Sequence, residues 1–141
     1  MVKLVEMGAA EGRVFLIPLS GARFIVAQVG RGDDLGVLDL TSEGSAPPDL
    51  ASAHLLFRID YGRKSPRRCH WRNAGTFALH PDLRDFAVYG YNAIGSSTYY
   101  RVSHEPREDE ISKAEFEQLE PLATWSHEDI VDRFRRESNA I

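Results

Sequence analysis

The sequence predicts an α+β protein led by β structure: a curved, mostly antiparallel sheet or small barrel followed by one or two short C-terminal helices. Two apolar runs rich in strand-forming residues, 12–19 and 24–29, flank a Ser20-Gly21 turn, which is typical of a β-hairpin. Further short apolar runs, separated by Gly and Pro turns, continue to residue 104. From Glu105 onward the density of β-branched and aromatic residues falls and helical spacing begins.

Length and composition describe one ordinary globular domain. The chain has 141 residues, 43% hydrophobic and 27% charged, so we expect a single domain over 1–141, β-rich over 1–104 with a helical tail over 105–141. Cys69 is the sole cysteine, which excludes an internal disulfide and fits a reducing compartment. With no signal peptide and no run long enough to cross a bilayer, we expect a cytoplasmic protein that does not contact membranes.

Strands are expected at eight places along the β-rich part. Pro18 cannot donate a backbone hydrogen bond, so it should lie at a strand end or on a sheet edge. Besides the hairpin, the expected strands cover residues 2–7, 35–40, 54–59, 69–72, 76–79, 86–91 and 97–102.

Helix signals in the tail are local. Ser112 and Glu115 match a capping box, and Phe116 and Leu119 should share a face. A second helix should begin after the N-cap Ser126. Trp125 and Ile130 have the spacing of a hydrophobic staple, and Ile130 and Phe134, four apart, should dock on the sheet.

Catalytic and metal-binding patterns are not visible. His80-Pro81-Asp82 is best interpreted as a turn, because a metal site needs three or four convergent ligands. Cys69 and His70 are adjacent, so on a strand they would point to opposite faces and could not pair. We therefore expect no catalytic residues, no metal and no cofactor.

Charge is unevenly distributed, although the net charge of −4 argues against a general nucleic-acid binder. Residues 58–72 are basic with interleaved aromatics, and residues 105–120 are acidic. Each cluster has an ordinary interpretation as a solvated surface, or the two clusters pair with one another. The acidic run could instead face a basic groove on a protein partner.

The hairpin resembles the opening of the immunity protein 26 family of bacterial polymorphic toxin systems. The matching residues run from Glu11-Gly12-Arg13-Val14-Phe15 through Pro18-Leu19 to Gly21 and 24–29, and Trp71 to Gly75 is similar to a second family feature. The family more often has an acid at the position of Arg13, and the tail from Glu105 has no counterpart that we can match. The resemblance implies a β-rich, cytoplasmic, non-enzymatic protein without a cofactor that neutralises a cognate toxin by stoichiometric contact. Toxins in such systems include nucleases.

Three functions follow from these patterns. In the first, an immunity protein binds its toxin through Glu105, Glu108, Asp109, Glu110, Tyr89 and Tyr91. Tyr89 and Tyr91, at alternate positions, share one sheet face, which either meets the partner or covers the core beneath the C-terminal helices. In the second, a small barrel binds nucleic acid through Arg63, Lys64, Arg67, Arg68, Tyr61 and Trp71, with backbone contacts and base stacking. In the third, the chain is a small enzyme that uses His80, Asp82 or Cys69 in a cleft.

Overall fold

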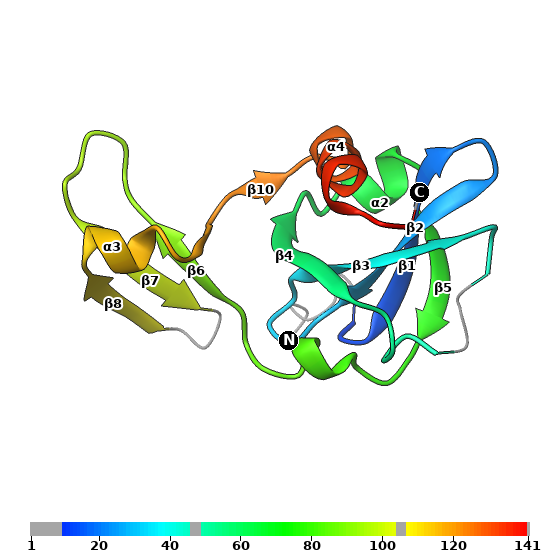
Figure 1. Cartoon of the computed structure of the whole chain (residues 1–141), viewed down its shortest axis with the longest axis horizontal. Coiled ribbons are helices and arrows are strands. Elements are labelled where there is room, and N and C mark those ends of the chain that lie inside the picture. The colour runs from blue at the N-terminus through cyan, green and yellow to red at the C-terminus, as the bar shows by residue number, and fades with distance from the viewer. Residues whose placement is uncertain (1–9, 46–48, 104–106, 141) are drawn as a thin grey trace, which may run out of the picture.

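The larger of two sheets has six strands in the order β10-β4-β3-β2-β1-β5 (Figure 1). Our description comes from a computed structural model and covers residues 10–45, 49–103 and 107–140, so the strand expected at 2–7 lies outside it. β10 runs parallel to β4 and the other neighbours are antiparallel. The strands are β1 Arg13–Ser20, β2 Arg23–Val29, β3 Leu35–Ser42, β4 Leu55–Tyr61, β5 Arg72–Thr76 and β10 Thr124–Trp125.

The predicted hairpin is formed by β1 and β2. Gly21 turns the chain with a positive φ of 56°, a conformation that glycine adopts at little cost. Pro18 pairs with Phe24 of β2, whereas the pairing of β1 with β5 ends at Leu16. Pro18 therefore lies where β5 no longer lines β1, as its missing donor requires.

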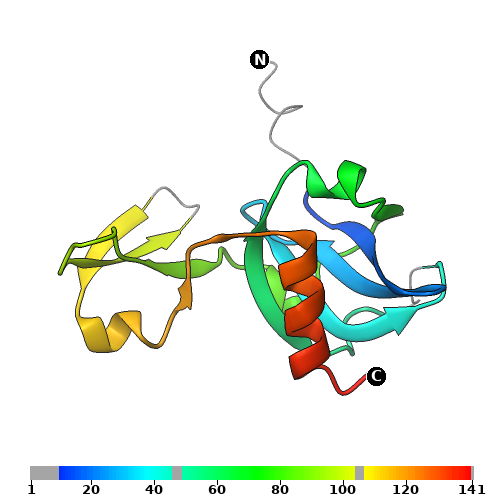
Figure 2. The same cartoon turned by 90° about the horizontal axis from the view of Figure 1, so that it is seen from above.

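Both faces of the large sheet are buried. Successive side chains of a strand point to opposite sides, so a single strand contributes to the apolar cluster on each face. Phe15 and Ile17 of β1 join one apolar cluster, and Val14 and Leu16 join another on the opposite side. Helix α4, His127–Glu137, lies across this side of the large sheet (Figure 2). Its Ile130 and Phe134 are fully buried in the first cluster. The predicted docking of this helix is confirmed, and so is its N-cap, since the Ser126 hydroxyl accepts from the Asp129 amide.

A second sheet of four strands, in the order β8-β7-β6-β9, lies beside the first (Figure 1). β9 runs parallel to β6 and the other pairs are antiparallel. Helix α3, Lys113–Phe116, packs on one face, with the Phe116 ring 4.9 Å from the Tyr99 ring. The predicted capping box of Ser112 and Glu115 is present. The strands are β6 Val88–Tyr91, β7 Tyr99–Ser103, β8 Arg107–Ile111 and β9 Glu120–Pro121.

The α+β class is confirmed, but the described residues form two mixed sheets, neither of which closes into a barrel. The helical tail predicted over 105–141 is wrong at its start, because Arg107–Ile111 is strand β8, held by pairing with β7. The strand expected at 76–79 is absent beyond Thr76, where β5 ends.

The strand expected at 69–72 is wrong except for Arg72, the first residue of β5. Helix α2, Ser65–Arg68, ends at Cys69, and His70 has a positive φ of 57° that interrupts an extended chain. The expected turn at His80-Pro81-Asp82 is confirmed as the short helix η1, Pro81–Leu83.

Candidate protein-binding surface

Cross-strand pairing gathers an exposed tyrosine, a half-buried tyrosine and exposed glutamates on one face of the small sheet. Tyr91 of β6 lies opposite Tyr100 of β7, which lies opposite Glu110 of β8. In the next row Val102 lies opposite Glu108. Directly paired residues share a face of the sheet, so these side chains form one continuous surface.

Leu122 extends this surface across β9. Continuing the parallel register of Gly90 and Pro121 by one residue places Leu122 beside Tyr91, and its amide donates to the Gly90 carbonyl at 2.8 Å. Tyr91 is 42% exposed and Leu122 is 40% exposed, so two large side chains are exposed on adjacent strands, and contiguous patches of this kind mark interaction surfaces. We call the set Tyr91, Tyr100, Val102, Glu108, Glu110 and Leu122 the tyrosine–glutamate face.

Tyr89 lies in the second row of the same sheet face but is not available to a partner. It is 2% exposed, and its hydroxyl donates to Asp34 Oδ2 at 3.0 Å. Asp34 is fully buried directly before β3 and also pairs with Arg58 of β4. The expectation that Tyr89 belongs to a binding surface is therefore wrong: this side chain joins the small sheet to the large one.

The network around Asp34 is well satisfied. The Arg58 guanidinium donates to Asp34 and also to the Arg31 carbonyl, at 3.0 Å. Burial raises the pKa of Tyr89, and the charge of Asp34 and the hydrogen bond to it raise this pKa further. Tyr89 is therefore a neutral donor, which is the form that this carboxylate requires.

A second link between the sheets runs from Glu120 of β9 to Arg133 of α4. The two side chains form paired hydrogen bonds of 2.8 and 3.1 Å, and Arg133 also stacks over the rings of Phe57 and Trp125. Partial burial alone would lower the pKa of Arg133, but its hydrogen bonds to Glu120 and Glu137 raise this pKa overall. The small sheet is therefore anchored to the rest of the protein at Tyr89 and Glu120, and the row of Tyr91, Tyr100 and Glu110 lies next to the anchored row.

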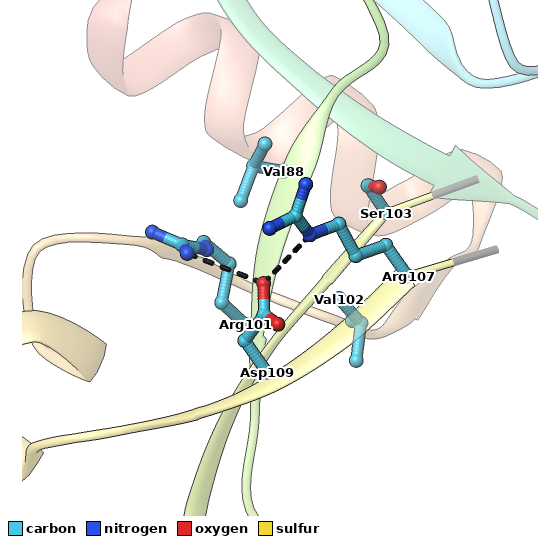
Figure 3. A pocket seen from close by; sticks show the side chains of 6 residues that line it. All are labelled: Val88, Arg101, Val102, Ser103, Arg107 and Asp109. Carbon is cyan, nitrogen blue, oxygen red and sulfur yellow. Dashed lines mark hydrogen bonds and ion pairs between the residues drawn. The ribbon is translucent and has the colours of Figure 1, made fainter. Parts of the chain in front are cut away.

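The predicted acidic cluster is divided by the sheet. Glu108 and Glu110 belong to the tyrosine–glutamate face, whereas Asp109 points to the opposite face. There its Oδ2 accepts from Arg101 at 3.3 Å and from Arg107 at 3.0 Å, in a hollow of about 280 Å³ (Figure 3). These hydrogen bonds, first from Arg101 and then from Arg107, lower the pKa of Asp109.

Asp109 is therefore paired with two arginines on the face opposite Glu108 and Glu110, so it does not belong to the same patch, and its contact with a partner stays a prediction. Glu105 lies outside the described residues. Of the predicted partner-binding residues, Tyr91, Glu108 and Glu110 lie together on one exposed face. Sequence reasoning did not assign Tyr100 or Leu122 to a site. The alternation of side chains along 97–102 could have predicted which sheet face Tyr100 lies on. The position of Leu122 depends on a parallel pairing with a distant strand, which no local sequence pattern predicts.

Among the residues predicted for nucleic-acid binding, the two aromatic residues are buried and the four cations are exposed. Tyr61 is 2% exposed and Trp71 is 7% exposed, both within the core under α4. Because bases must reach an open ring face to stack, the prediction of stacking on these two residues is wrong. The four predicted cations, by contrast, are exposed.

The histidine and cysteine candidates do not converge. His80 is buried; its Nδ1 accepts from the Asp82 amide and its Nε2 lies 2.7 Å from the Ala53 carbonyl. These contacts show His80 stabilising a turn. Within residues 10–45, 49–103 and 107–140, no three His, Cys, Asp or Glu side chains gather in a group that could hold a metal ion.

No protein-family model, curated protein or solved structure matches this chain. Among the helices that the structure describes, none is both long and apolar enough to cross a membrane.

Proposed function

We propose that this chain is an immunity protein that neutralises a cognate bacterial toxin by covering part of its surface through the tyrosine–glutamate face. The row Leu122–Tyr91–Tyr100–Glu110 is the observation that carries the proposal. The resemblance of the hairpin to the immunity protein 26 family supports the class of partner. In this role the protein acts in the cytoplasm, needs no cofactor and catalyses no reaction.

Tyrosine suits such a surface for physical reasons. A tyrosine contributes a large, rigid contact area and loses little side-chain freedom on binding, so it is enriched among the residues that dominate binding energy. Tyr91 and Tyr100 are direct cross-strand neighbours in a sheet whose attachment is fixed by Tyr89 and Glu120. A partner would therefore meet an ordered pair of rings, which limits the entropy lost on association.

The charges beside the rings specify the partner's chemistry. Glu108 and Glu110 are exposed on β8, next to Val102 and Tyr100. Two carboxylates flanking an apolar centre complement a surface with lysines or arginines around an apolar depression. The cationic substrate groove of a nuclease has this character, and acids facing it would also speed encounter.

The proposal predicts that a toxin domain is encoded beside this chain, and it is tested by expressing that domain from an inducible promoter with and without the chain. Wild type should protect the cells, and Tyr91→Ala combined with Tyr100→Ala should abolish protection and weaken binding at least 100-fold. Phe77→Ala is the matched control, because Phe77 is an exposed aromatic residue that follows β5 of the large sheet. Full protection by the double tyrosine variant would contradict the proposed surface, and no neutralisation by wild type would contradict the function.

Charge reversal tests the role of the glutamates separately. Glu108→Lys with Glu110→Lys should slow association at least tenfold at low salt, and the difference should shrink at high salt. The control is Asp85→Lys with Glu117→Lys, which changes the net charge equally at exposed positions outside the face. Asp109→Asn should leave association unchanged, because Asp109 is on the opposite face. Equal slowing in the control pair would show that only net charge matters.

A further inference from the structure

A cluster of cations without counter-ions lies on the short helix α2, on the large sheet and away from the tyrosine–glutamate face. Lys64 is the N-cap, and Arg67 and Arg68 follow three and four residues later, a spacing that places them on one face of the helical turn. Within the part of the chain that the structure describes, none of these three side chains has a hydrogen-bonding or ionic partner. Like charges at this spacing repel one another, so the cluster favours a bound anion.

The cluster lines concave surface. One hollow of about 510 Å³ is lined by Arg63, Lys64, Arg67 and Arg68. A second hollow of about 480 Å³ shares Arg63, Lys64 and Arg68 with it and extends to Ser126 and His127 at the start of α4. These volumes are in the range of sites for small molecules.

Arg63 forms a fixed wall of both hollows. Its guanidinium donates to the Tyr61 and Asp33 carbonyls at 2.7 and 2.8 Å and stacks over the Tyr61 ring. Ion pairs with Asp60 and Asp33, at 3.1 and 3.4 Å, neutralise its charge. The charge available to a ligand is therefore that of Lys64, Arg67 and Arg68.

His127 adds a neutral donor to the second hollow. Its Nδ1 lies 3.0 Å from the Trp71 indole nitrogen, which can only donate a hydrogen bond. Nδ1 is therefore the acceptor, and the ring proton is on Nε2. A neutral His127 can donate this proton to an anion, while Glu128 is the acidic residue lining the same hollow.

We propose that these joined hollows bind a compact, soluble anion bearing several phosphate groups, with Lys64, Arg67 and Arg68 as its counter-charges. Three cations within one helical turn match the charge density of a short phosphate chain. The rings of Tyr61 and Trp71 are buried, so the site recognises phosphate and not stacked bases. The site is on a different sheet from the protein-binding surface, and the proposal does not depend on the immunity function.

Isothermal titration of the full chain with inorganic triphosphate at low ionic strength tests the site. One triphosphate should bind per chain, and Arg67→Gln with Arg68→Gln should weaken binding at least tenfold. The matched control, Arg84→Gln with Arg136→Gln, removes two exposed charges elsewhere and should change binding less than twofold. Amide resonances of Ser126 and His127 should shift on binding in wild type and not in the α2 variant.

Three outcomes would overturn the proposal. The first is no binding of triphosphate to wild type, and the second is equal weakening in the two double variants, which would indicate nonspecific charge attraction. The third comes from a thymidine oligonucleotide carrying many more phosphates. If it binds through Arg67 and Arg68 at least tenfold more tightly than triphosphate does, the ligand is an extended nucleic-acid backbone and the compact site is wrong. Circular dichroism of each variant confirms that it is folded, as expected for exposed positions.

Discussion

Replacing Tyr89 with phenylalanine removes one oxygen atom from the junction between the two sheets. That oxygen donates to Asp34, a carboxylate with no exposed surface whose other donor side chain is Arg58. A hydrogen bond to a charged group contributes about 1.5–3 kcal/mol to the free energy of unfolding. Because the Arg58 pairing survives in the variant, we expect the lower part of this range, about 1.5–2 kcal/mol.

Urea unfolding followed by circular dichroism measures this loss, and Tyr91→Phe is the control. Tyr91 has the same chemistry two residues along the strand, but it is exposed, so its change should be within about 0.5 kcal/mol. Hydrogen exchange should show the amides of β6 and β7 less protected in the Tyr89 variant, with those of β2 and β3 little changed. Equal effects of the two substitutions would refute a stabilising role for the buried hydroxyl.

Because the pKa of Tyr89 is raised in the folded protein, the stability difference between wild type and Tyr89→Phe should depend on pH. Its folded-state pKa lies above the unfolded value near 10, so its contribution is complete below about pH 10 and is lost as the pH rises further. The stability advantage of wild type over Tyr89→Phe should therefore shrink above pH 10, by up to about 1.4 kcal/mol per pH unit. A constant difference from pH 9 to 11 would contradict the assigned environment.

Three further substitutions test the packing, each measured by urea unfolding. Gly90→Ala should cost about 1–3 kcal/mol, because a Cβ would lie 2.8 Å from a ring carbon of Phe116 and displace α3; an unchanged midpoint would contradict this packing. Phe134→Ala should cost about 3–5 kcal/mol, since the ring is fully buried, whereas exposed Phe77→Ala should cost far less. Ser126→Ala should cost about 1 kcal/mol through loss of the N-cap of α4, and no loss would show that the cap is dispensable.

Helix α4 could be predicted in detail because its signals are local. The cap at Ser126 and the spacing of Ile130 and Phe134 are properties of a single short segment. The hairpin was equally accessible, since a glycine turn between two apolar runs defines it. In both cases residues close in sequence make the decisive contacts.

Strand β8 shows where local reasoning failed. Its residues, Arg107 to Ile111, are mostly charged and lack the apolar alternation of a strand. The segment is extended because it pairs with β7, where Asp109 lies opposite Arg101. The same pairing divided the acidic run between two faces, which no count of charges along the chain could have shown.

Tyr89 and Tyr91 illustrate the difference between what the local sequence predicts and what contacts between distant segments decide. The β-led class and the local helix caps could be predicted from the chain alone. So could the shared sheet face of these two tyrosines, because alternation is a property of any extended chain. The burial of Tyr89 against Asp34, 55 residues away in sequence, could not be predicted in this way, nor could the exposure of Tyr91 beside Tyr100. Burial and charge pairing depend on which distant segments meet, and that is settled by the packing of the whole chain.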